Sequence, residues 1–506
     1  MSSGVEEKER HVFPRWRSFE ATCSLGELKT PKVSVPPDAA RLDASFARGV
    51  AAWEMDRSLW ADLDILGSAV ILGKLGAMSE LVAKAKMDPR TPSFALETLR
   101  SASRGDAPVQ LELEGVDVTD QQGARRDIRE RRSCLGGYPH DPVGWVDLAL
   151  AYTVVGDDKK AGRAIRAALQ LAPNDRFVLR SAARFFIHIG EPQIAFEHLA
   201  RADSTKVDPW LMAAEIAVAD YLGRTSRLQK VARGEIESGK SGHDLTELAS
   251  ALGSLEAANG NRRAARRLLK KALNGANENT VAQIRWLNRT SLGEVVDASA
   301  AAPPLLYEAN AWVSYHAGDF QAALGESLRW LRDQPFSSAP ATLSSFILAD
   351  LMWDFQAGAS VAEAGLKANP RDLMLLNNFA VCLMELGRVE DAEALIVRAR
   401  SENQGGKAAS TLRATAGMLQ FRLGRSDAGR LLYLDAIDAA RAKGDKRTAE
   451  RAAYHLAFEE VRSRAGGLGS ALRYVAEFEG AMGRAEEKRY EERLRELVAS
   501  GASAGC

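Results

Sequence analysis

Cysteine and histidine are scarce in this chain of 506 residues, which contains four cysteines and seven histidines. No two cysteines have the spacing of a zinc site or a redox motif, and the histidines form no metal-binding pattern. The cysteines are Cys23, Cys134, Cys382 and Cys506. Because scattered thiols suit a reducing compartment, the sequence predicts a cytoplasmic protein with no metal site, no cofactor and no disulfide framework.

Sequence strings alone do not indicate a catalytic site. The chain contains no HExxH string, and its matches to the P-loop string at 234–241 and to GxSxG at 501–505 do not follow a predicted strand, which both motifs require, so we expect a protein that is not an enzyme. One alternative stays open, a small catalytic domain within the non-repeat N-terminal region, although no nucleophile and base can be assigned there.

Neither net charge nor apolar length directs the chain to a membrane. Lys plus Arg and Asp plus Glu both number 67, so no net field draws the whole molecule to a membrane or to nucleic acid. The most apolar stretch, Ile65 to Met78, is shorter than a membrane span and contains Lys74. We therefore expect no membrane partner.

What the chain does contain is a helix-turn-helix pattern between Pro142 and Asp175. The residues that carry it are Trp145, Leu148, Tyr152, Gly156, Ala161, Ala168 and Pro173. The first three share one helix face, and a glycine suits the left-handed conformation at a helix end. The pattern resembles the tetratricopeptide repeat (TPR) family, of a bacterial type. A unit of about 34 residues cannot bury its own apolar faces, so the resemblance implies an all-α, right-handed α-solenoid of stacked repeats.

Turn glycines repeat this pattern along the chain. They are Gly190, Gly223, Gly260, Gly318, Gly387 and Gly424. The turn at Trp353 is less clear, because Trp-Asp-Phe replaces the usual Gly-Asp-Tyr. Pro303 and Pro304 cannot lie inside a helix, so they divide the array. We predict a first TPR block at 141–279, an irregular break at 280–304, a second TPR-like block at 305–480, and a C-terminal capping helix and tail at 481–506.

The residues before the repeats follow another pattern. We predict an extended arm at 1–40 and a mostly helical region at 41–140 with a small hairpin near residues 109–118. The arm contains Arg15, Trp16 and Arg17, and arginines beside an aromatic ring can stack on bases or pack on an acidic partner. In the alternative interpretation, Phe13 and Trp16 dock onto the chain's own solenoid.

A basic cluster lies just before the repeats. Arg125, Arg126 and Arg129 are candidates for nucleic-acid contact together with the arm. The cluster also contains Arg131 and Arg132. The alternative is that Asp127 and Glu130 pair with arginines of the cluster along one helix.

The TPR resemblance implies that first helices line a concave groove, where a protein or peptide partner binds. In the second repeat Arg180, Arg184 and His188 are four residues apart and form a cationic stripe. The corresponding candidates in later repeats are Trp312, Tyr315, His316, Asn377, Met384 and Phe421. Each of them could instead pack against a neighbouring repeat.

The predicted function is that of a non-catalytic scaffold or adaptor in a larger assembly. Residues 180–186 and 208–211 also resemble TPR companions of nuclease-containing bacterial conflict systems. The alternative function is therefore a nucleic-acid-associated adaptor, or a regulatory subunit of a nuclease or defence complex, that uses the basic N-terminal residues.

Overall fold

The computed structural model describes residues 10–25, 46–47, 50–51, 53–54, 58–71, 75–91, 96, 99–100, 121–238, 242–293, 296–298, 301, 303–403, 406 and 408–503. All regular structure in this part of the chain is helical, as the sequence predicts. The chain separates into two compact units that part between Leu306 and Tyr307. We call the described residues on either side of this point the N-terminal unit and the C-terminal unit. The predicted hairpin lies outside the described residues.

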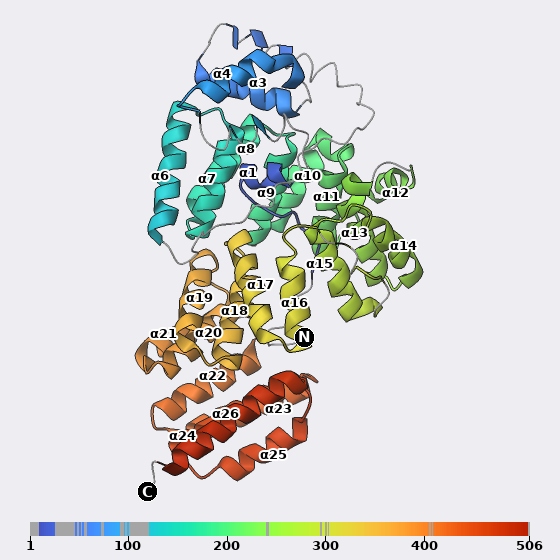
Figure 1. The fold of residues 1–506 in the computed structure, drawn as a ribbon. Helices are drawn as coiled ribbons and strands as arrows, with labels where there is room; N and C mark the ends of the chain where they lie inside the picture. Colours follow the sequence, from blue (N-terminus) through green and yellow to red (C-terminus); the bar gives the residue numbers. More distant parts are fainter. Residues whose placement is uncertain are drawn as a thin grey trace. The chain divides into compact units, whose positions relative to one another are not determined.

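The N-terminal unit consists mainly of helix pairs (Figure 1). Before the pairs lie α1 (Phe19–Ser24), α3 (Leu59–Ile71), η1 (Leu75–Met78), α4 (Ser79–Met87) and α6 (Gln121–Gly137). The pairs are α7 (Pro142–Val154) with α8 (Asp158–Leu171), α9 (Arg176–His188) with α10 (Pro192–Arg201), α11 (Pro209–Tyr221) with α12 (Gln229–Glu237), and α13 (Gly242–Ala258) with α14 (Arg262–Ala272). The turn η2 (Asp203–Lys206) precedes α11, and α15 (Glu278–Leu287) continues into a π-helical turn, η3 (Asn288–Leu292).

The first pair shows why the sequence folds into these units. Asp141 accepts a hydrogen bond from the backbone N–H of Val143 and caps α7, with Pro142 in the first turn. Gly156 has a φ of 77°, a left-handed conformation that glycine adopts without strain. Asp157 then caps α8. The turn between the helices is short, so the two helices pack side by side.

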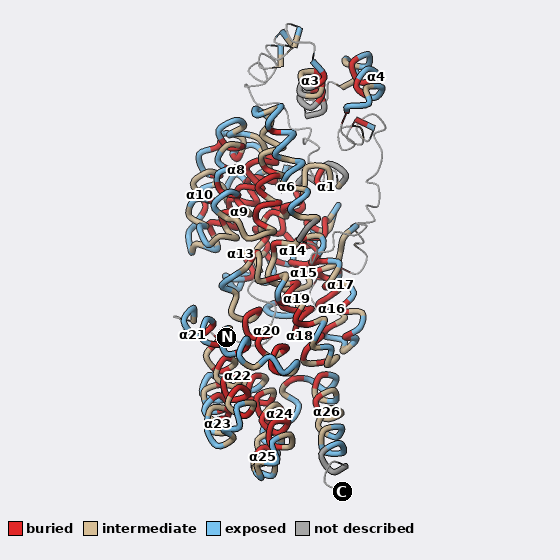
Figure 2. The backbone as a smooth tube through the Cα atoms, turned by 90° about the vertical axis from the view of Figure 1, so that its left-hand side faces the viewer, coloured by how far each residue is buried: buried red, intermediate tan, exposed pale blue. Residues whose placement is uncertain are grey.

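First helices are more deeply buried than second helices (Figure 2). Nearly every residue of α9 from Arg176 to Phe186 is buried, whereas α14 buries a narrow stripe of alanines and leucines. The reason is that a first helix lies between the first helices of adjacent repeats as well as against its own second helix. A residue that repeat register assigns to the concave face is therefore often covered.

The C-terminal unit continues the helix-pair architecture. Its helices are α16 (Tyr307–Ala317), α17 (Phe320–Asp333), α18 (Ser338–Phe346) with the π-helical turn η4 (Ile347–Leu351), α19 (Phe355–Ala368), α20 (Leu373–Glu385), α21 (Val389–Glu402), α22 (Ala409–Arg422), α23 (Ser426–Ala442), α24 (Lys446–Ser463), α25 (Leu468–Phe478) and α26 (Arg484–Ser503). Both units are thus TPR-like stacks of helix pairs.

The turn that was unclear from the sequence, because it lacks a glycine, forms around Trp353. This residue has a φ of 60°, the left-handed conformation that a glycine supplies in the other turns. The conformation costs a non-glycine residue about 1–2 kcal/mol. The Trp353 ring lies edge-on to Phe458 at 6.0 Å and to Tyr490 at 5.8 Å, and these contacts offset the backbone strain.

The segment predicted to be irregular, 280–304, is helical as far as Leu292, because α15 pairs with the preceding repeat as a further first helix. From Gly293 to Leu306 the described residues form no helix. Among the described helices, none is both long and apolar enough to cross a membrane.

Candidate functional site

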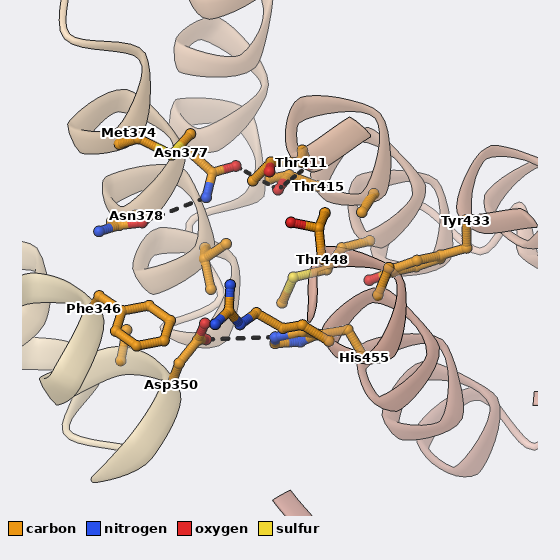
Figure 3. Close-up of a pocket in the computed structure, with 16 residues that line it drawn as sticks. Phe346, Asp350, Met374, Asn377, Asn378, Thr411, Thr415, Tyr433, Thr448 and His455 are labelled. Atoms are coloured by element: carbon orange, nitrogen blue, oxygen red, sulfur yellow. Dashed lines mark hydrogen bonds and ion pairs between the residues drawn. The ribbon is translucent and has the colours of Figure 1, made fainter. Parts of the chain in front are cut away.

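A hollow lies inside the C-terminal unit, between the first helices of four consecutive repeats (Figure 3). Its walls come from α18 with η4, α20, α22 and α24. The volume is about 70 Å³, which is enough for several waters or one side chain. Polar residues line much of it: Asp350, Asn377, Asn378, Thr411, Thr415, Tyr433, Thr448, Arg451 and His455.

Two asparagines and a threonine make up one side of the hollow (Figure 3). Thr415 Oγ1 donates a hydrogen bond to Asn377 Oδ1 at 2.6 Å, and Asn377 Nδ2 donates to Asn378 Oδ1 at 3.4 Å. Asn378 Nδ2 in turn donates to Ser345 Oγ at 3.0 Å. An amide nitrogen carries two protons, so Asn377 retains capacity to donate a hydrogen bond to a bound group.

The opposite side of the hollow carries an acid–base pair. His455 Nε2 lies 3.5 Å from Asp350 Oδ1, and Asp350 belongs to the π-helical turn η4. Burial works to raise the pKa of Asp350, but the charges of His455 and Arg451 outweigh it and hold that pKa below its ordinary value. Asp350 is therefore a carboxylate at neutral pH, and it gives this side of the hollow hydrogen-bond-accepting capacity.

Helix α26 contacts Arg451, one of the residues that line the hollow. Its Glu486 accepts hydrogen bonds from Arg447 Nη2 at 2.5 Å, Arg451 Nη2 at 2.6 Å and the Tyr315 hydroxyl at 3.1 Å. Tyr490, also on α26, is completely buried, and its ring stacks on Phe458 at 6.0 Å. The predicted capping helix is thus more than a polar cap, because α16 and α24 both hold it through buried side chains.

The predicted partner-binding residues of the C-terminal unit have different surroundings. Asn377 lines the hollow, and His316 is exposed and stacks on Trp312 at 5.9 Å. Four others are buried, namely Trp312, Tyr315, Met384 and Phe421. Trp312 and Tyr315 belong to the apolar cluster that holds α26, so they contact the chain itself in this structure.

Repeat reasoning missed the residues that α24 contributes to the hollow. Thr448, Arg451 and His455 recur at helical spacing and so share one face of a first helix. That helical spacing is the sequence signal by which these three residues could have been predicted. No such signal marks Tyr433, because it reaches the hollow from α23, a second helix.

In the N-terminal unit the first-helix face is covered by residues 10–25, the described part of the predicted arm (dark blue in Figure 1). These residues are called the arm from here on. Trp16 is fully buried, with its ring edge-on to Phe185 at 6.1 Å, and Phe13 lies edge-on to Tyr221 at 5.5 Å. Arg17 Nη2 donates to Glu278 Oε1 at 2.6 Å. The structure therefore shows the docked alternative.

The remaining arm candidate, Arg15, is half-buried. Nucleic-acid contact by Arg15, Trp16 and Arg17 stays a prediction, and it requires the arm to leave this face.

Arg180 is buried inside the N-terminal unit rather than exposed at a surface. Its side chain is 6% exposed, and Nη1 donates to Glu247 Oε2 at 2.8 Å, while the guanidinium lies 4.8 Å from the Trp210 ring. Burial opposes ionisation of Glu247, but Arg180 outweighs it and lowers the pKa of that carboxyl. Asn279 Nδ2 also donates to Glu247, at 3.0 Å.

The other basic candidates lie elsewhere on the N-terminal unit. Arg184 and His188 are half-buried, so the three members of the predicted stripe differ in exposure. Arg125, Arg126 and Arg129 are exposed on α6. Contact between any of these residues and a partner stays a prediction.

No family model and no curated protein matches this chain. Among solved structures, a human IFIT1 dimer with PPP-AAAA is 15% identical, with a TM-score of 0.36 over 75% of this chain and 95% of that chain. Yeast Tom70 is 13% identical, with a TM-score of 0.28 over 76% of this chain and 93% of that chain. Naa15/Naa10 bound to HypK-THB is 15% identical, with a TM-score of 0.22 over 90% and 80%. These similarities are too low to carry an argument about the site.

Proposed function

We propose that the chain is a non-catalytic adaptor within a larger assembly, and that its C-terminal unit binds a segment of a partner protein in the hollow between α18, α20, α22 and α24. The polar lining is the observation that supports this proposal. Burying amides, hydroxyls and a carboxylate costs stability unless they find partners, and stacking of repeats alone requires only apolar contacts. Polar groups on four adjacent first helices therefore suit a ligand better than they suit packing.

The lining also suggests what the partner presents. Asn377 and Asn378 can donate to and accept from a main chain, and Thr415 fixes the orientation of Asn377. Asp350 faces them as a carboxylate. We therefore propose that the partner supplies one hydrogen-bond-donating side chain, directed at Asp350, from an extended segment.

The experiment uses a variant that removes both members of the Asn377–Thr415 pair. Asn377→Leu with Thr415→Val replaces both partners by apolar groups, and Asn378 Oδ1 loses only the 3.4 Å hydrogen bond from Asn377, so we expect a small cost to stability. We expect the double variant to bind the purified partner about tenfold to a hundredfold more weakly, because each hydrogen bond is worth about 0.5–1.5 kcal/mol.

The partner is first identified by affinity purification from the native host and mass spectrometry, and its affinity is then measured by calorimetry. The matched control is Val397→Ala, an exposed change on α21 outside the hollow that should leave the affinity unchanged. Equal affinity of the double variant and the parental chain, with the helical signal intact, would exclude this site.

A second candidate function rests on α6. Arg125, Arg129 and Arg132 are exposed at positions i, i+4 and i+7, so one face of this helix presents three cations. Such a row suits a phosphate backbone and supports a nucleic-acid-associated adaptor, for instance a regulatory subunit of a nuclease complex. Changing the three arginines to glutamate should abolish salt-sensitive retention of labelled RNA or DNA, whereas retention that ignores both salt and these changes would exclude the idea.

A further inference from the structure

The arm of the N-terminal unit has the features of a bound peptide. Residues 10–18 form no helix, and burial alternates from His11 to Trp16: Val12, Pro14 and Trp16 are buried, while His11, Phe13 and Arg15 are half-buried. Alternation with a period of two is the pattern of an extended chain that places every second side chain in a pocket.

Helix α15 recognises the backbone of the arm as well as its side chains. Gln283 Nε2 donates to the carbonyl of Arg10 at 3.0 Å, and Asn279 Nδ2 donates to the carbonyl of Phe13 at 2.9 Å. The same two amides accept from the Arg10 guanidinium, at 2.7 Å and 2.8 Å. Side-chain amides that hold main-chain carbonyls would fit the backbone of any extended segment, whatever its sequence.

Side-chain pockets then add selectivity. Val12 enters an apolar cluster with Met212, Ile216 and Leu252, and Trp16 meets Phe185. At the far end Arg17 pairs with Glu278, and both side chains are at least 94% buried. Phe19 follows, with its ring 5.3 Å from Phe177 and its N–H donating to Asp147 Oδ1 at 3.0 Å. The face therefore fits an arginine at each end of an apolar, tryptophan-containing core.

Arg180 helps to position this face through Glu247. Arg180 holds Glu247, Glu247 accepts from Asn279, and Asn279 holds the arm at Phe13. The chain of contacts fixes the amide of Asn279 in the orientation that the arm requires.

We propose that residues 10–19 are an intramolecular ligand of a peptide-binding groove formed by α9, α11, α13 and α15, and that this groove accepts an extended segment of a partner protein with the same chemistry once the arm is displaced. The inference extends the proposed adaptor function to a second site. It rests on other residues in the other unit, so the two proposals can fail separately.

In the intact chain the tethered arm occupies the groove and competes with any other segment for it; we call this state the closed groove. With an effective concentration of about 1 mM for the tethered arm and a Kd of about 10 µM for the arm in the open groove, a competing segment needs about a hundredfold higher concentration to enter the closed groove than to enter the open one. Weakening the arm should therefore strengthen binding of a segment supplied in trans.

The first experiment weakens the arm by one substitution that leaves the groove intact. A fluorescent synthetic peptide of residues 10–25 is titrated into the full-length chain and into Trp16→Ala. A buried tryptophan anchor is a typical hot spot, so we expect the variant to bind the peptide at least about tenfold more tightly than the parental chain. A peptide that itself carries Trp16→Ala and Arg17→Ala should bind the variant at least about tenfold more weakly.

A second experiment avoids dependence on that one variant. A protease site is inserted within residues 26–45 of the full chain, which is cleaved and then diluted to nanomolar concentration before the labelled peptide is added. We expect the peptide to exchange into the cleaved chain, and Asn377→Leu with Thr415→Val in the other unit to leave this binding unchanged. The proposal is overturned if the arm stays bound against excess peptide or if its release unfolds the chain. It is also overturned if a folded Trp16→Ala chain binds the peptide no better than the parental chain.

Discussion

Glu486 is the residue whose removal tests the packing of the C-terminal unit most directly. Its carboxylate is 4% exposed and accepts from Arg447, Arg451 and Tyr315. Substitution by alanine would leave two guanidinium groups, 20% and 11% exposed, without their shared acceptor. Breaking a buried ion pair by removing one partner costs about 3–5 kcal/mol. Because Arg447 keeps some access to water, we expect Glu486→Ala to cost about 3 kcal/mol, at the lower end of that range.

The assay is urea unfolding of the intact chain, with hydrogen exchange of α24 and α26 to locate the effect. Glu486→Gln keeps the shape and one acceptor oxygen, so we expect a loss of about 2 kcal/mol. The control on the same helix is Glu496→Ala. Glu496 is 64% exposed and pairs with Arg493 at 3.2 Å, and an exposed pair contributes about 0–1 kcal/mol.

The pH dependence gives a second measure of the same interaction. Burial tends to raise the pKa of Glu486, but Arg451 and Arg447 outweigh it, so the folded pKa lies below the ordinary value of 4.5. A depressed carboxyl pKa supplies stability that is present above the unfolded pKa and lost as the pH falls through the folded one. The difference between Glu486→Ala and the parental chain should therefore persist at neutral pH and shrink in acid. A difference below about 0.5 kcal/mol at pH 7 would refute the reasoning, because that is the range of ordinary surface changes.

Three further predictions concern other parts of the chain. Burial raises the pKa of Asp147 to about 6, although Arg131 attracts its carboxylate. The free energy of unfolding of the N-terminal unit should therefore fall as the pH rises from 4 to 7. Asp147→Asn should flatten that pH dependence in unfolding curves. Arg180→Ala should destabilise the chain by about 3–5 kcal/mol, since Glu247 would remain buried without its cation; a loss within 1 kcal/mol would contradict this. A Cβ on Gly417 would lie 2.8 Å from the Tyr433 ring and 2.9 Å from a backbone carbonyl. Gly417→Ala should therefore lower the free energy of unfolding by about 1–3 kcal/mol, measured by thermal unfolding. The control is Gly325→Ala, in open space on α17, which should be neutral or stabilising.

The helix pairs could be predicted from the sequence because their cause is local. A glycine at a fixed offset, an aspartate after it and small residues at the helix crossing produce each turn without long-range information. All seven turn glycines identified from the sequence, from Gly156 to Gly424, have a positive φ. The turn at Trp353 formed without a glycine because distant aromatic rings stabilise it, and such contacts cannot be read from a repeat pattern.

The hollow could not be predicted, because its polar groups belong to four repeats that meet only after stacking. Asp350 lies on a π-helical turn, and its partner His455 is more than a hundred residues further along the chain. Repeat register did place Asn377 at this face. Spacing along one helix identified candidates, whereas the assembled site depends on how neighbouring first helices face one another.

Two residues that repeat register predicts for partner binding contact the chain itself in the structure. In the N-terminal unit, register predicts Arg180 as a cation for a partner, and Arg180 supports through Glu247 the amide of Asn279 that holds the arm. In the C-terminal unit, register predicts Tyr315 as an aromatic contact, and its hydroxyl donates to Glu486 of α26.

Both results have one physical cause. The concave face of a repeat stack is lined by side chains from several helices and forms an extended binding surface. Non-repeat segments before or after the repeats can bury their side chains on that face. Such a segment is a permanent part of the core if it almost never dissociates, and an exchangeable ligand if it does. Which case applies depends on its Kd for the face relative to the effective concentration that the tether gives it. The arm meets the groove through main-chain carbonyls and alternate side chains, as a ligand does, whereas α26 meets its neighbours through a buried ionic cluster and stacked rings. We therefore expect the arm to exchange and α26 to remain, a difference that hydrogen exchange of the two segments in one sample would measure.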